Sequence, residues 1–271
     1  MTKITYKYNH KKPFIVMLPH SGRQYEDIFL EQTKLKINTL RETEDAYLDK
    51  ILLDKFSNIS FIAANFPRIF IDVNRSPLEI DENMLEKNNI SKIFYKNSVK
   101  VNYGIGVFAK VNNLGKNIYY EKLSMDEIRR RLHFYYFPYH KKIRSFLSKT
   151  LDKHKVVIGL DCHSMSSNIV DNNLDVVLSN LDGIAADFEI LHIMQAIFKD
   201  NNYKVAINNP FKGGFVSQKY GNPKKNIHII QIELNKKLYL DEITFKLKEE
   251  GVKKIQKCFK MFLESIEEKI S

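Results

Sequence analysis

Short runs of apolar and β-branched residues recur along the chain, each followed by a polar or helical segment. Runs of this length are typical of strands that are covered on both faces of a sheet. We therefore predict strands at residues 14–18, 59–64, 69–73, 156–160, 176–178, 203–207 and 227–234.

Apolar residues at helical spacing occupy much of the sequence between these runs. They predict helices at residues 43–56, 124–151, 183–200 and 241–268. The second helix starts with Ser124 and Glu127 at the spacing of a capping box. Pro138 should break or kink this helix, because proline lacks the amide hydrogen and clashes with the preceding turn.

The alternation of strands and helices predicts an α/β sandwich with a largely parallel or mixed sheet. The stretch 75–120 fits least well, since it is polar and rich in asparagine, and we expect an irregular excursion over the sheet edge there. The sequence shows no repeat, low-complexity tract or flexible linker. These features favour a single domain over residues 1–271.

The net charge of +11 raises the possibility of nucleic-acid binding. The lysines are spread along the whole chain, however, without the basic and aromatic stripe of a strand-binding groove. We expect a lysine-rich solvated surface that attracts small anionic substrates, with neither nucleic acid nor membrane as a partner. The two cysteines do not form a disulfide framework, and no apolar run is long enough for a membrane span, so we expect a cytoplasmic protein.

Two of the eight histidines, His20 and His163, directly follow long apolar strands. Two imidazoles at one sheet edge suit a metal centre, because neutral imidazole is a strong zinc ligand. The alternative is that each histidine caps its strand through backbone hydrogen bonds. Asp161 should share a side of its strand with His163 and orient the ring, whereas Cys162 should face away, which argues against a Cys–His nucleophilic pair.

A third ligand would have to come from elsewhere in the chain. The acidic residues Glu42, Glu44 and Asp45, around the start of the helix predicted at residues 43–56, are candidates. The alternative for this cluster is a favourable interaction with the helix dipole. Residue chemistry by itself does not separate Asp45 from Glu44.

A carboxylate in an apolar central strand is costly unless it has a partner, so Glu233 is a candidate general base beside a metal-bound water. A structural ion pair is the alternative. Arg75 follows a predicted strand and offers a fork suited to a substrate carboxylate, unless it is an ordinary surface arginine. Gly213 and Gly214 would permit a close backbone approach to a ligand, or simply a turn.

Several short segments occur in the order of a known family. They are Pro19-His20-Ser21-Gly22, Thr43-Glu44-Asp45, Pro138-Tyr139-His140, Asp161-Cys162-His163-Ser164-Met165, Asn209-Pro210-Phe211-Lys212-Gly213-Gly214, Tyr220-Gly221-Asn222-Pro223 and Gln231-Ile232-Glu233-Leu234-Asn235 with Leu238-Tyr239. Together they resemble the N-formylglutamate amidohydrolase family from about residue 14 to residue 242.

The family is similar to the zinc carboxypeptidase and aspartoacylase fold, which implies three α/β/α layers around a mixed, mostly parallel sheet. The resemblance also implies one Zn²⁺, or another divalent ion, held by His20 and His163. Carboxypeptidases place a ligand carboxylate three residues after the first histidine, where this chain has Arg23. The resemblance therefore implies Asp45 as the third ligand. Glu44 and Glu26 are the alternatives.

The resemblance further implies that Asn74 and Arg75 bind a substrate carboxylate, helped by Lys110 or Lys212 and by the loop with Gly213 and Gly214. A family segment near residues 103–107 is expected to carry a nearby arginine, where this chain has Lys110. Glu233 would take a proton from the zinc-bound water and give it to the leaving amine.

The implied reaction converts N-formyl-L-glutamate to formate and L-glutamate, a terminal step of histidine breakdown. One alternative is a deacylase or peptidase that acts on another N-acyl amino acid. An alternative of a different class is a catalytically inactive, basic polyanion-binding protein, and a metal-free pseudoenzyme is a third. These alternatives differ in metal content and in formate release.

Overall fold

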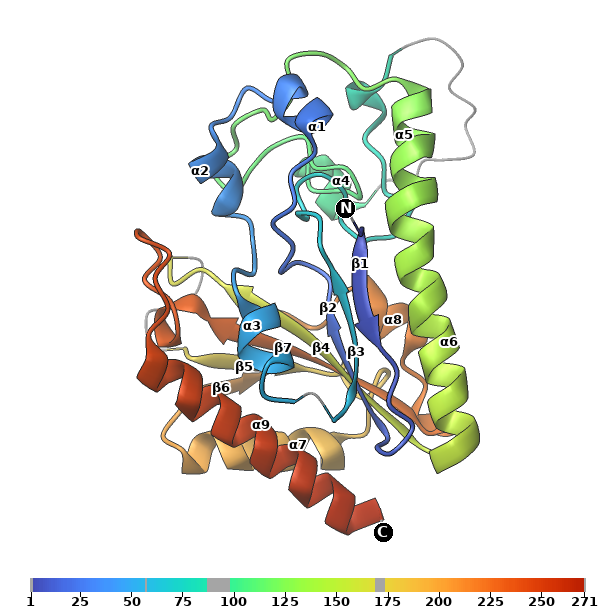
Figure 1. Ribbon diagram of the computed structural model, residues 1–271, viewed down its shortest axis with the longest axis vertical. Coiled ribbons are helices and arrows are strands. Elements are labelled where there is room, and N and C mark those ends of the chain that lie inside the picture. Colours follow the sequence, from blue (N-terminus) through green and yellow to red (C-terminus); the bar gives the residue numbers. More distant parts are fainter. Residues whose placement is uncertain (1, 57, 87–97, 169–173, 271) are drawn as a thin grey trace. The chain divides into compact units, whose positions relative to one another are not determined.

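Seven strands form one mixed sheet in the computed structural model of the chain, which describes residues 2–56, 58–86, 98–168 and 174–270 (Figure 1). The strands lie in the order β1-β3-β2-β4-β7-β5-β6. Their bounds are β1 Ile4–Lys7, β2 Phe14–Leu18, β3 Ser60–Ala64, β4 Val157–Met165, β5 Val176–Ser179, β6 Val205–Ile207 and β7 Ile227–Asn235.

Three of the four strand pairs whose register is described are parallel. β4 pairs in parallel with both β2 and β7, β5 pairs in parallel with β6, and β5 pairs antiparallel with β7. The prediction of an α/β fold with a mixed, mostly parallel sheet is therefore confirmed. β2 is buried along its whole length, which explains its continuous apolar sequence. β4 is also buried along its whole length, including the polar residues Asp161 and His163 near its end.

Nine α-helices accompany the sheet in the described ranges. Their bounds are α1 Asp27–Gln32, α2 Ile37–Arg41, α3 Leu48–Leu53, α4 Val99–Asn102, α5 Met125–Arg131, α6 Phe137–His154, α7 Phe188–Asp200, α8 Phe215–Tyr220 and α9 Glu249–Ile270. Short 3₁₀ helices occupy Glu82–Met84, Pro223–Lys225 and Lys236–Leu238. No helix in the described part of the chain is long and apolar enough to cross a membrane.

The chain divides into two compact units. The first consists of Met1–Thr5, Pro19–Ala46 and Ile62–Arg144, and the second of Tyr6–Leu18, Tyr47–Phe61 and Ser145–Ser271. In the second unit α3 contacts β4 and α9, and α7 contacts α9 and β5. The buried residues of α9 recur at helical spacing: Ile255, Cys258, Phe259, Phe262, Leu263 and Ile266.

Two predicted elements are wrong in a way that matters for the site. The helix predicted from Thr43 begins only at Leu48, because Tyr47 before it adopts the left-handed conformation with φ 65°. The apolar run at 69–73 forms turns instead of a strand, although its apolar residues are buried. It folds back on Pro67, since the amide of Phe70 donates to the Pro67 carbonyl at 3.0 Å. Burial, not pairing, explains its apolar character.

Smaller differences concern the ends of elements. β4 runs through Asp161 and His163 instead of ending before them, and β1 was not expected. The last two predicted helices begin later than expected, at Phe188 and Glu249.

The long helix follows its prediction closely. The Ser124 hydroxyl accepts from the amide of Glu127 at 3.2 Å, which confirms the cap. Pro138 does not end the helix. A π-helical turn at Leu132–Tyr136 joins α5 to α6, and this wider turn precedes the proline that cannot donate an amide hydrogen.

A fully buried arginine organises the core of the first unit. Arg131 donates to Glu127 at 2.6 Å and to the carbonyl of Phe70 at 2.9 Å. It also donates to the Tyr119 hydroxyl at 2.8 Å and to the Gln32 side-chain oxygen at 2.9 Å. These bonds fix the irregular segment that leads from Phe70 toward Asp72 and Arg75.

The described parts of the stretch 75–120 contain the 3₁₀ helix at Glu82–Met84 and the short helix α4. Residues 87–97, which also belong to the expected excursion, lie outside the described residues. The single domain over residues 1–271 stays a prediction.

Candidate metal centre

The sheet brings two histidine-bearing segments to one edge. β2 and β4 are parallel neighbours, with Met17 aligned to Asp161. His20 follows β2 by two residues, and His163 lies near the end of β4. Because parallel neighbours end at the same edge, both imidazoles are delivered to the carboxyl end of the sheet, where ligands gather in α/β folds.

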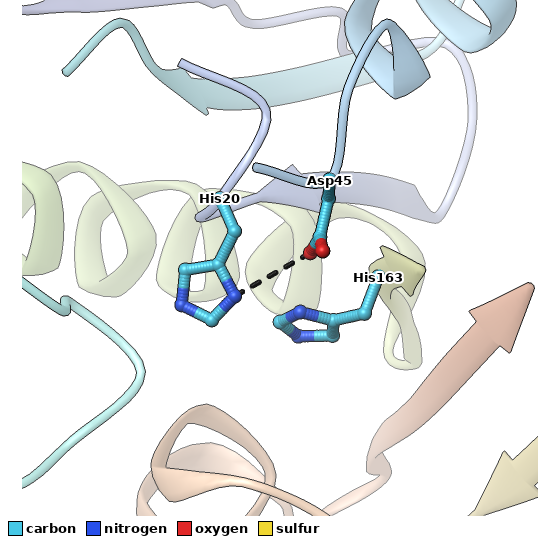
Figure 2. Close-up of side chains that lie close together, drawn as sticks. All are labelled: His20, Asp45 and His163. Carbon is cyan, nitrogen blue, oxygen red and sulfur yellow. Dashed lines mark ion pairs between the residues drawn. The ribbon is translucent and has the colours of Figure 1, made fainter. Parts of the chain in front are cut away.

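His20, Asp45 and His163 each offer one ligand atom, and these atoms lie within 4.8 Å of one another (Figure 2). All three side chains are buried, with at most 3% of any residue exposed. Two imidazole nitrogens and one carboxylate oxygen match the protein donor set of catalytic zinc sites. The residues present therefore fit a divalent metal ion with preference for nitrogen and oxygen ligands.

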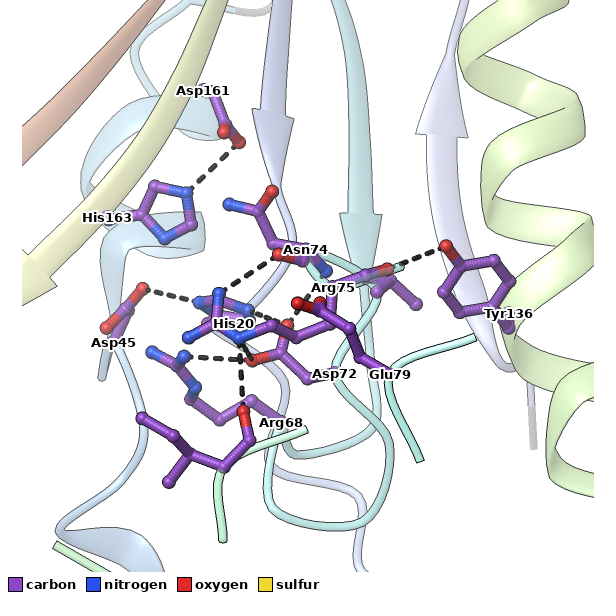
Figure 3. Close-up of polar contacts among 12 residues, drawn as sticks. His20, Asp45, Arg68, Asp72, Asn74, Arg75, Glu79, Tyr136, Asp161 and His163 are labelled. Atoms are coloured by element: carbon purple, nitrogen blue, oxygen red, sulfur yellow. Dashed lines mark hydrogen bonds and ion pairs between the residues drawn. The ribbon is translucent and has the colours of Figure 1, made fainter. Parts of the chain in front are cut away.

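Hydrogen bonding decides which His20 nitrogen faces this centre. Nε2 lies 2.7 Å from Oδ1 of Asp72, and Nδ1 lies 3.4 Å from Oδ2 of Asp45 (Figure 3). The amide of Asp45 also donates to the His20 carbonyl at 3.0 Å, which ties the two segments together. Nδ1 is thus the nitrogen on the side of Asp45.

Asp72 is held ionised by its neighbours. Burial favours the neutral acid, but the contact with His20 and the charges of Arg68 and Arg75 outweigh burial and lower the pKa of Asp72 well below its usual range. Arg68 donates to Oδ2 of Asp72 at 2.9 Å, and the amide of Asn74 donates to Oδ1 at 2.8 Å. A buried carboxylate with these partners is a fixed anchor for the His20 ring.

Asp161 has the corresponding position beside His163. Its Oδ1 lies 3.2 Å from Nε2 of His163, and both residues lie on β4. Nδ1 of His163 is then the nitrogen that is not directed at Asp161. Each of the two histidines therefore has a carboxylate against its Nε2 atom (Figure 3).

The alternative ligands Glu44 and Glu26 lie in other contacts. Tyr25 donates to Glu44 at 2.7 Å, and Arg41 lies 3.6 Å from the same carboxylate. Burial raises the pKa of Glu44. Glu26 forms an ion pair with Lys3. Of the three acids considered, Asp45 is the one grouped with the histidines.

Glu233 lies on β7 directly opposite His163 in the parallel register. Gln231, which is opposite Asp161, donates its amide to Oε1 of Glu233 at 2.9 Å. Asn235 on the same face of β7 donates to the Leu174 carbonyl at 2.9 Å. Glu233 thus has an amide donor at its carboxylate and a histidine beside it on the next strand.

Asn74 and Arg75 lie in the turn region after Asp72. Arg75 donates from Nη1 to the Asn74 carbonyl at 3.0 Å and from Nε to the Ile105 carbonyl at 3.2 Å. Its Nε atom lies 4.0 Å from Oδ2 of Asp72. The guanidinium is thus held beside the carboxylate that anchors His20 (Figure 3).

Of the other predicted substrate residues, the two lysines form ion pairs with aspartates and the two glycines lie directly before α8. Lys110 lies 3.2 Å from Asp81, and Lys212 lies 3.0 Å from Asp182 in an exposed pair. Gly213 has φ +134°, as a glycine-dependent turn requires, and Gly214 precedes α8 as its N-cap.

Three further residues were not identified from the sequence: Asp72, Arg68 and Lys100. Lys100 is half-buried, and burial followed by the charge of Arg75 lowers its pKa. Asp72 stands two positions before Asn74. Its position close to residues expected to bind a substrate carboxylate could have identified Asp72 as a site residue from the sequence. No sequence pattern around Arg68 or Lys100 identifies them as site residues, because only folding brings them close to this site.

The fold and the donor set define an α/β protein with a candidate metal centre at the carboxyl edge of its sheet. Comparison with known proteins then gives the family. The profile of the N-formylglutamate amidohydrolase family matches residues 12–240, and the chain belongs to this family.

Similar proteins cover nearly the whole chain. A crystal structure of N-formylglutamate amidohydrolase from Ralstonia eutropha JMP134 superposes with a TM-score of 0.90 at 26% identity, covering 100% of this chain and 99% of that one. N-formylglutamate deformylase from Pseudomonas putida is 25% identical and covers 98% of this chain and 96% of its own. The same-named protein from Pseudomonas aeruginosa is 24% identical, with 85% and 83% covered. The resemblance noted in the sequence is confirmed, while the relation to zinc carboxypeptidases stays a prediction.

Proposed function

We propose that this chain is a metal-dependent amidohydrolase that converts N-formyl-L-glutamate and water to formate and L-glutamate. The observation that carries the proposal is the buried group of two histidines and one aspartate, His20, Asp45 and His163. Family membership and the names of the similar proteins supply the substrate. A cytoplasmic location and a role in histidine breakdown belong to the same proposal.

His20, Asp45 and His163 would hold one Zn²⁺ or another divalent ion. Such an ion supplies Lewis acidity, which polarises the amide carbonyl and makes a water molecule a stronger nucleophile. Asp72 keeps the His20 ring in a fixed orientation and tautomer, as carboxylates behind ligand histidines do. Asp161, which lies 3.2 Å from Nε2 of His163, is the proposed counterpart for the second ring.

Glu233 is the proposed proton carrier. It accepts a proton from the attacking water as the water oxygen bonds to the formyl carbon, and it delivers that proton to the nitrogen as the C–N bond breaks. Two contacts support this role: its place opposite His163 in the register and the amide hydrogen bond from Gln231. That hydrogen bond holds the carboxylate in one orientation.

Asn74 and Arg75 are the proposed binding residues for a substrate carboxylate. The planar guanidinium of Arg75 offers two parallel donors to such a group. Lys110, Lys212, Gly213 and Gly214 are kept as secondary candidates. Both lysines would have to exchange their present aspartate partners for the substrate.

Metal analysis together with formate release tests the proposal. The purified wild-type protein should contain about one divalent ion per chain and release formate from N-formyl-L-glutamate. His163→Ala should lose both properties, whereas His10→Ala at an exposed position should keep both. A wild-type protein without bound metal, or activity that persists in His163→Ala, would refute the metal-dependent mechanism.

A substrate panel tests the acyl group and the amino acid separately. N-formyl and N-acetyl derivatives of glutamate, aspartate and alanine should be compared at equal concentration. We expect the formyl derivatives to be hydrolysed faster than the acetyl derivatives, and the glutamate derivatives faster than the alanine derivatives. Activity confined to the acetyl derivatives would defeat the formyl assignment while leaving the hydrolase class intact.

A further inference from the structure

The segment Val73–Ser76, which carries Asn74 and Arg75, lies outside every helix and strand. Its backbone groups therefore have no regular ladder of hydrogen bonds, and their orientation depends on individual partners. The directions of the Asn74 and Arg75 side chains follow from the peptide planes on either side of them. What holds these planes consequently decides where the two side chains lie.

In the first two peptide groups of this segment, both the carbonyl and the amide form hydrogen bonds. In the peptide between Val73 and Asn74, His140 Nε2 donates to the Val73 carbonyl at 3.0 Å, and the Asn74 amide donates to Asp72 Oδ1 at 2.8 Å. In the next peptide, the Asn74 carbonyl accepts from Arg75 Nη1 at 3.0 Å, and the Arg75 amide donates to the Asp72 carbonyl at 3.3 Å.

The third peptide plane is held in the same manner. The Tyr136 hydroxyl donates to the Arg75 carbonyl at 2.7 Å (Figure 3). On the other side of this plane, the Ser76 amide donates to Glu79 Oε2 at 3.1 Å. His140 and Tyr136 thus both donate to residues 73–76 from a distant part of the sequence.

The helix presents these two donors as one unit. Tyr136 is the last residue of the π-helical turn, and His140 follows four residues later in α6. Residues at this spacing share a helix face, and the two rings pack with their centroids 4.3 Å apart. Both residues are buried, with 2% and 1% exposed. Ring packing and burial restrict the rotamers of both side chains.

We propose that Tyr136 and His140 are positioning residues that hold the Val73 and Arg75 carbonyls and thereby aim the Arg75 guanidinium and the Asn74 amide at the substrate carboxylate. This inference rests on the proposed function, in which Asn74 and Arg75 bind that carboxylate. Neither Tyr136 nor His140 touches the reacting atoms in this mechanism. They act through the backbone, and a displacement of about 1 Å at a positioning group can cost a hundredfold in rate.

Removal of one hydroxyl tests the proposal. In Tyr136→Phe we expect kcat/KM for N-formyl-L-glutamate to fall about tenfold to a hundredfold, mainly through KM, because carboxylate binding is weakened. Metal content should stay at the wild-type level. Tyr135→Phe is the matched control, since the Tyr135 hydroxyl lies near Glu26 and Lys3 instead of at the Arg75 carbonyl, and it should keep kcat/KM within about threefold.

A double-mutant cycle separates positioning from a general structural effect. In an Arg75→Ala background there is no guanidinium to aim, so adding Tyr136→Phe should lower kcat/KM by less than about threefold more. Full additivity of the two substitutions would overturn the proposal. So would an unchanged KM in Tyr136→Phe.

The variant at His140 gives a second, independent readout. His140→Gln keeps an amide donor and should retain more carboxylate affinity than His140→Leu, which has none. L-glutamate binding, measured by calorimetry on metal-loaded protein, gives this order without turnover, and equal affinity in both variants would count against the proposal. Thermal unfolding of each variant identifies any that fail to fold.

The two hypotheses fail differently in these experiments. A wild-type protein that neither hydrolyses N-formyl-L-glutamate nor binds L-glutamate refutes the proposed function. A wild-type protein that does both, with Tyr136→Phe behaving like Tyr135→Phe, refutes the positioning role alone.

Discussion

Nε2 of His20 lies 2.7 Å from Oδ1 of Asp72, although the two residues are 52 positions apart in the sequence. Asp72 also accepts from Arg68 and from the Asn74 amide, so its carboxylate cannot easily turn away. This contact leaves Nδ1 of His20 on the side of Asp45. It connects the proposed metal centre with the segment that carries Arg75.

Asp72→Asn should weaken metal binding. The amide removes the negative charge behind the His20 ring, and changes of this kind cost roughly tenfold to a hundredfold in metal affinity. Competition with a fluorescent zinc chelator measures the change. Asp126→Asn, at a position with a 92% exposed side chain, is the control and should match the wild type. Equal affinity in Asp72→Asn would show that this contact has no part in metal binding.

Paired substitutions identify the third ligand. Asp45→Asn should reduce the metal content per chain severely, because it removes the carboxylate grouped with both histidines. Glu44→Gln should keep the metal, since Glu44 accepts a hydrogen bond from Tyr25 and forms an ion pair with Arg41. Elemental analysis after dialysis measures both proteins, and the reverse pattern would make Glu44 the ligand.

Gly22→Ala should destabilise the fold. A Cβ atom at position 22 would lie 2.3 Å from the Phe66 carbonyl oxygen, and a backbone atom cannot move aside cheaply. Overpacking of this kind costs about 3 kcal/mol of unfolding free energy at the upper end of its usual range.

Gly115→Ala is the comparison for this prediction. Its added Cβ meets no atom within 4 Å, and the positive φ of +72° there costs roughly 1–2 kcal/mol. Urea unfolding ranks the two variants, and a smaller loss in Gly22→Ala would contradict the close approach at Phe66.

Glu127 should make stability depend on pH in the acid range. Burial favours the neutral acid, but the hydrogen bonds and charges of Arg130 and Arg131 outweigh it and lower the pKa below 4.5. A carboxyl group with a lowered folded-state pKa contributes stability above about pH 4.5, and that contribution is lost as the pH falls through the folded-state pKa.

The variant Glu127→Gln tests this dependence. It should be less stable than the wild type by about 3 kcal/mol near pH 6, because it leaves buried Arg131 without its carboxylate. The difference between the two proteins should shrink steadily toward pH 3. Urea unfolding at several pH values measures it, and a constant difference would show that Glu127 does not titrate in this range.

Much of the sheet could be predicted from local pattern. The apolar run at Phe14–Leu18 matches β2 residue for residue, and the run that became β7 was located to within one residue. The start of β4 was also located to within one residue, but β4 extends five residues beyond its predicted end. The cap at Ser124 was also predictable, because its hydrogen bond spans only three residues. In these cases the physical cause lies within the segment itself.

Burial without pairing explains the main error in the fold. Residues 69–73 are as apolar as a strand, yet they turn back at Pro67 and are held by Arg131 through the Phe70 carbonyl. An apolar run indicates that a segment is buried. It does not indicate whether the segment pairs with a neighbouring strand.

The sequence by itself determined the residue types of the proposed centre, since two histidines after apolar strands indicate a metal site wherever the strands become parallel neighbours. The family resemblance implied Asp45 as the third member, and the tertiary structure groups it with the two histidines. Only the tertiary structure decided that Asp72 stands behind His20 and that Tyr136 and His140 reach the carbonyls around Arg75. The reason is that backbone conformation depends mainly on near neighbours in the chain, whereas these contacts join side chains that only folding brings within hydrogen-bond distance.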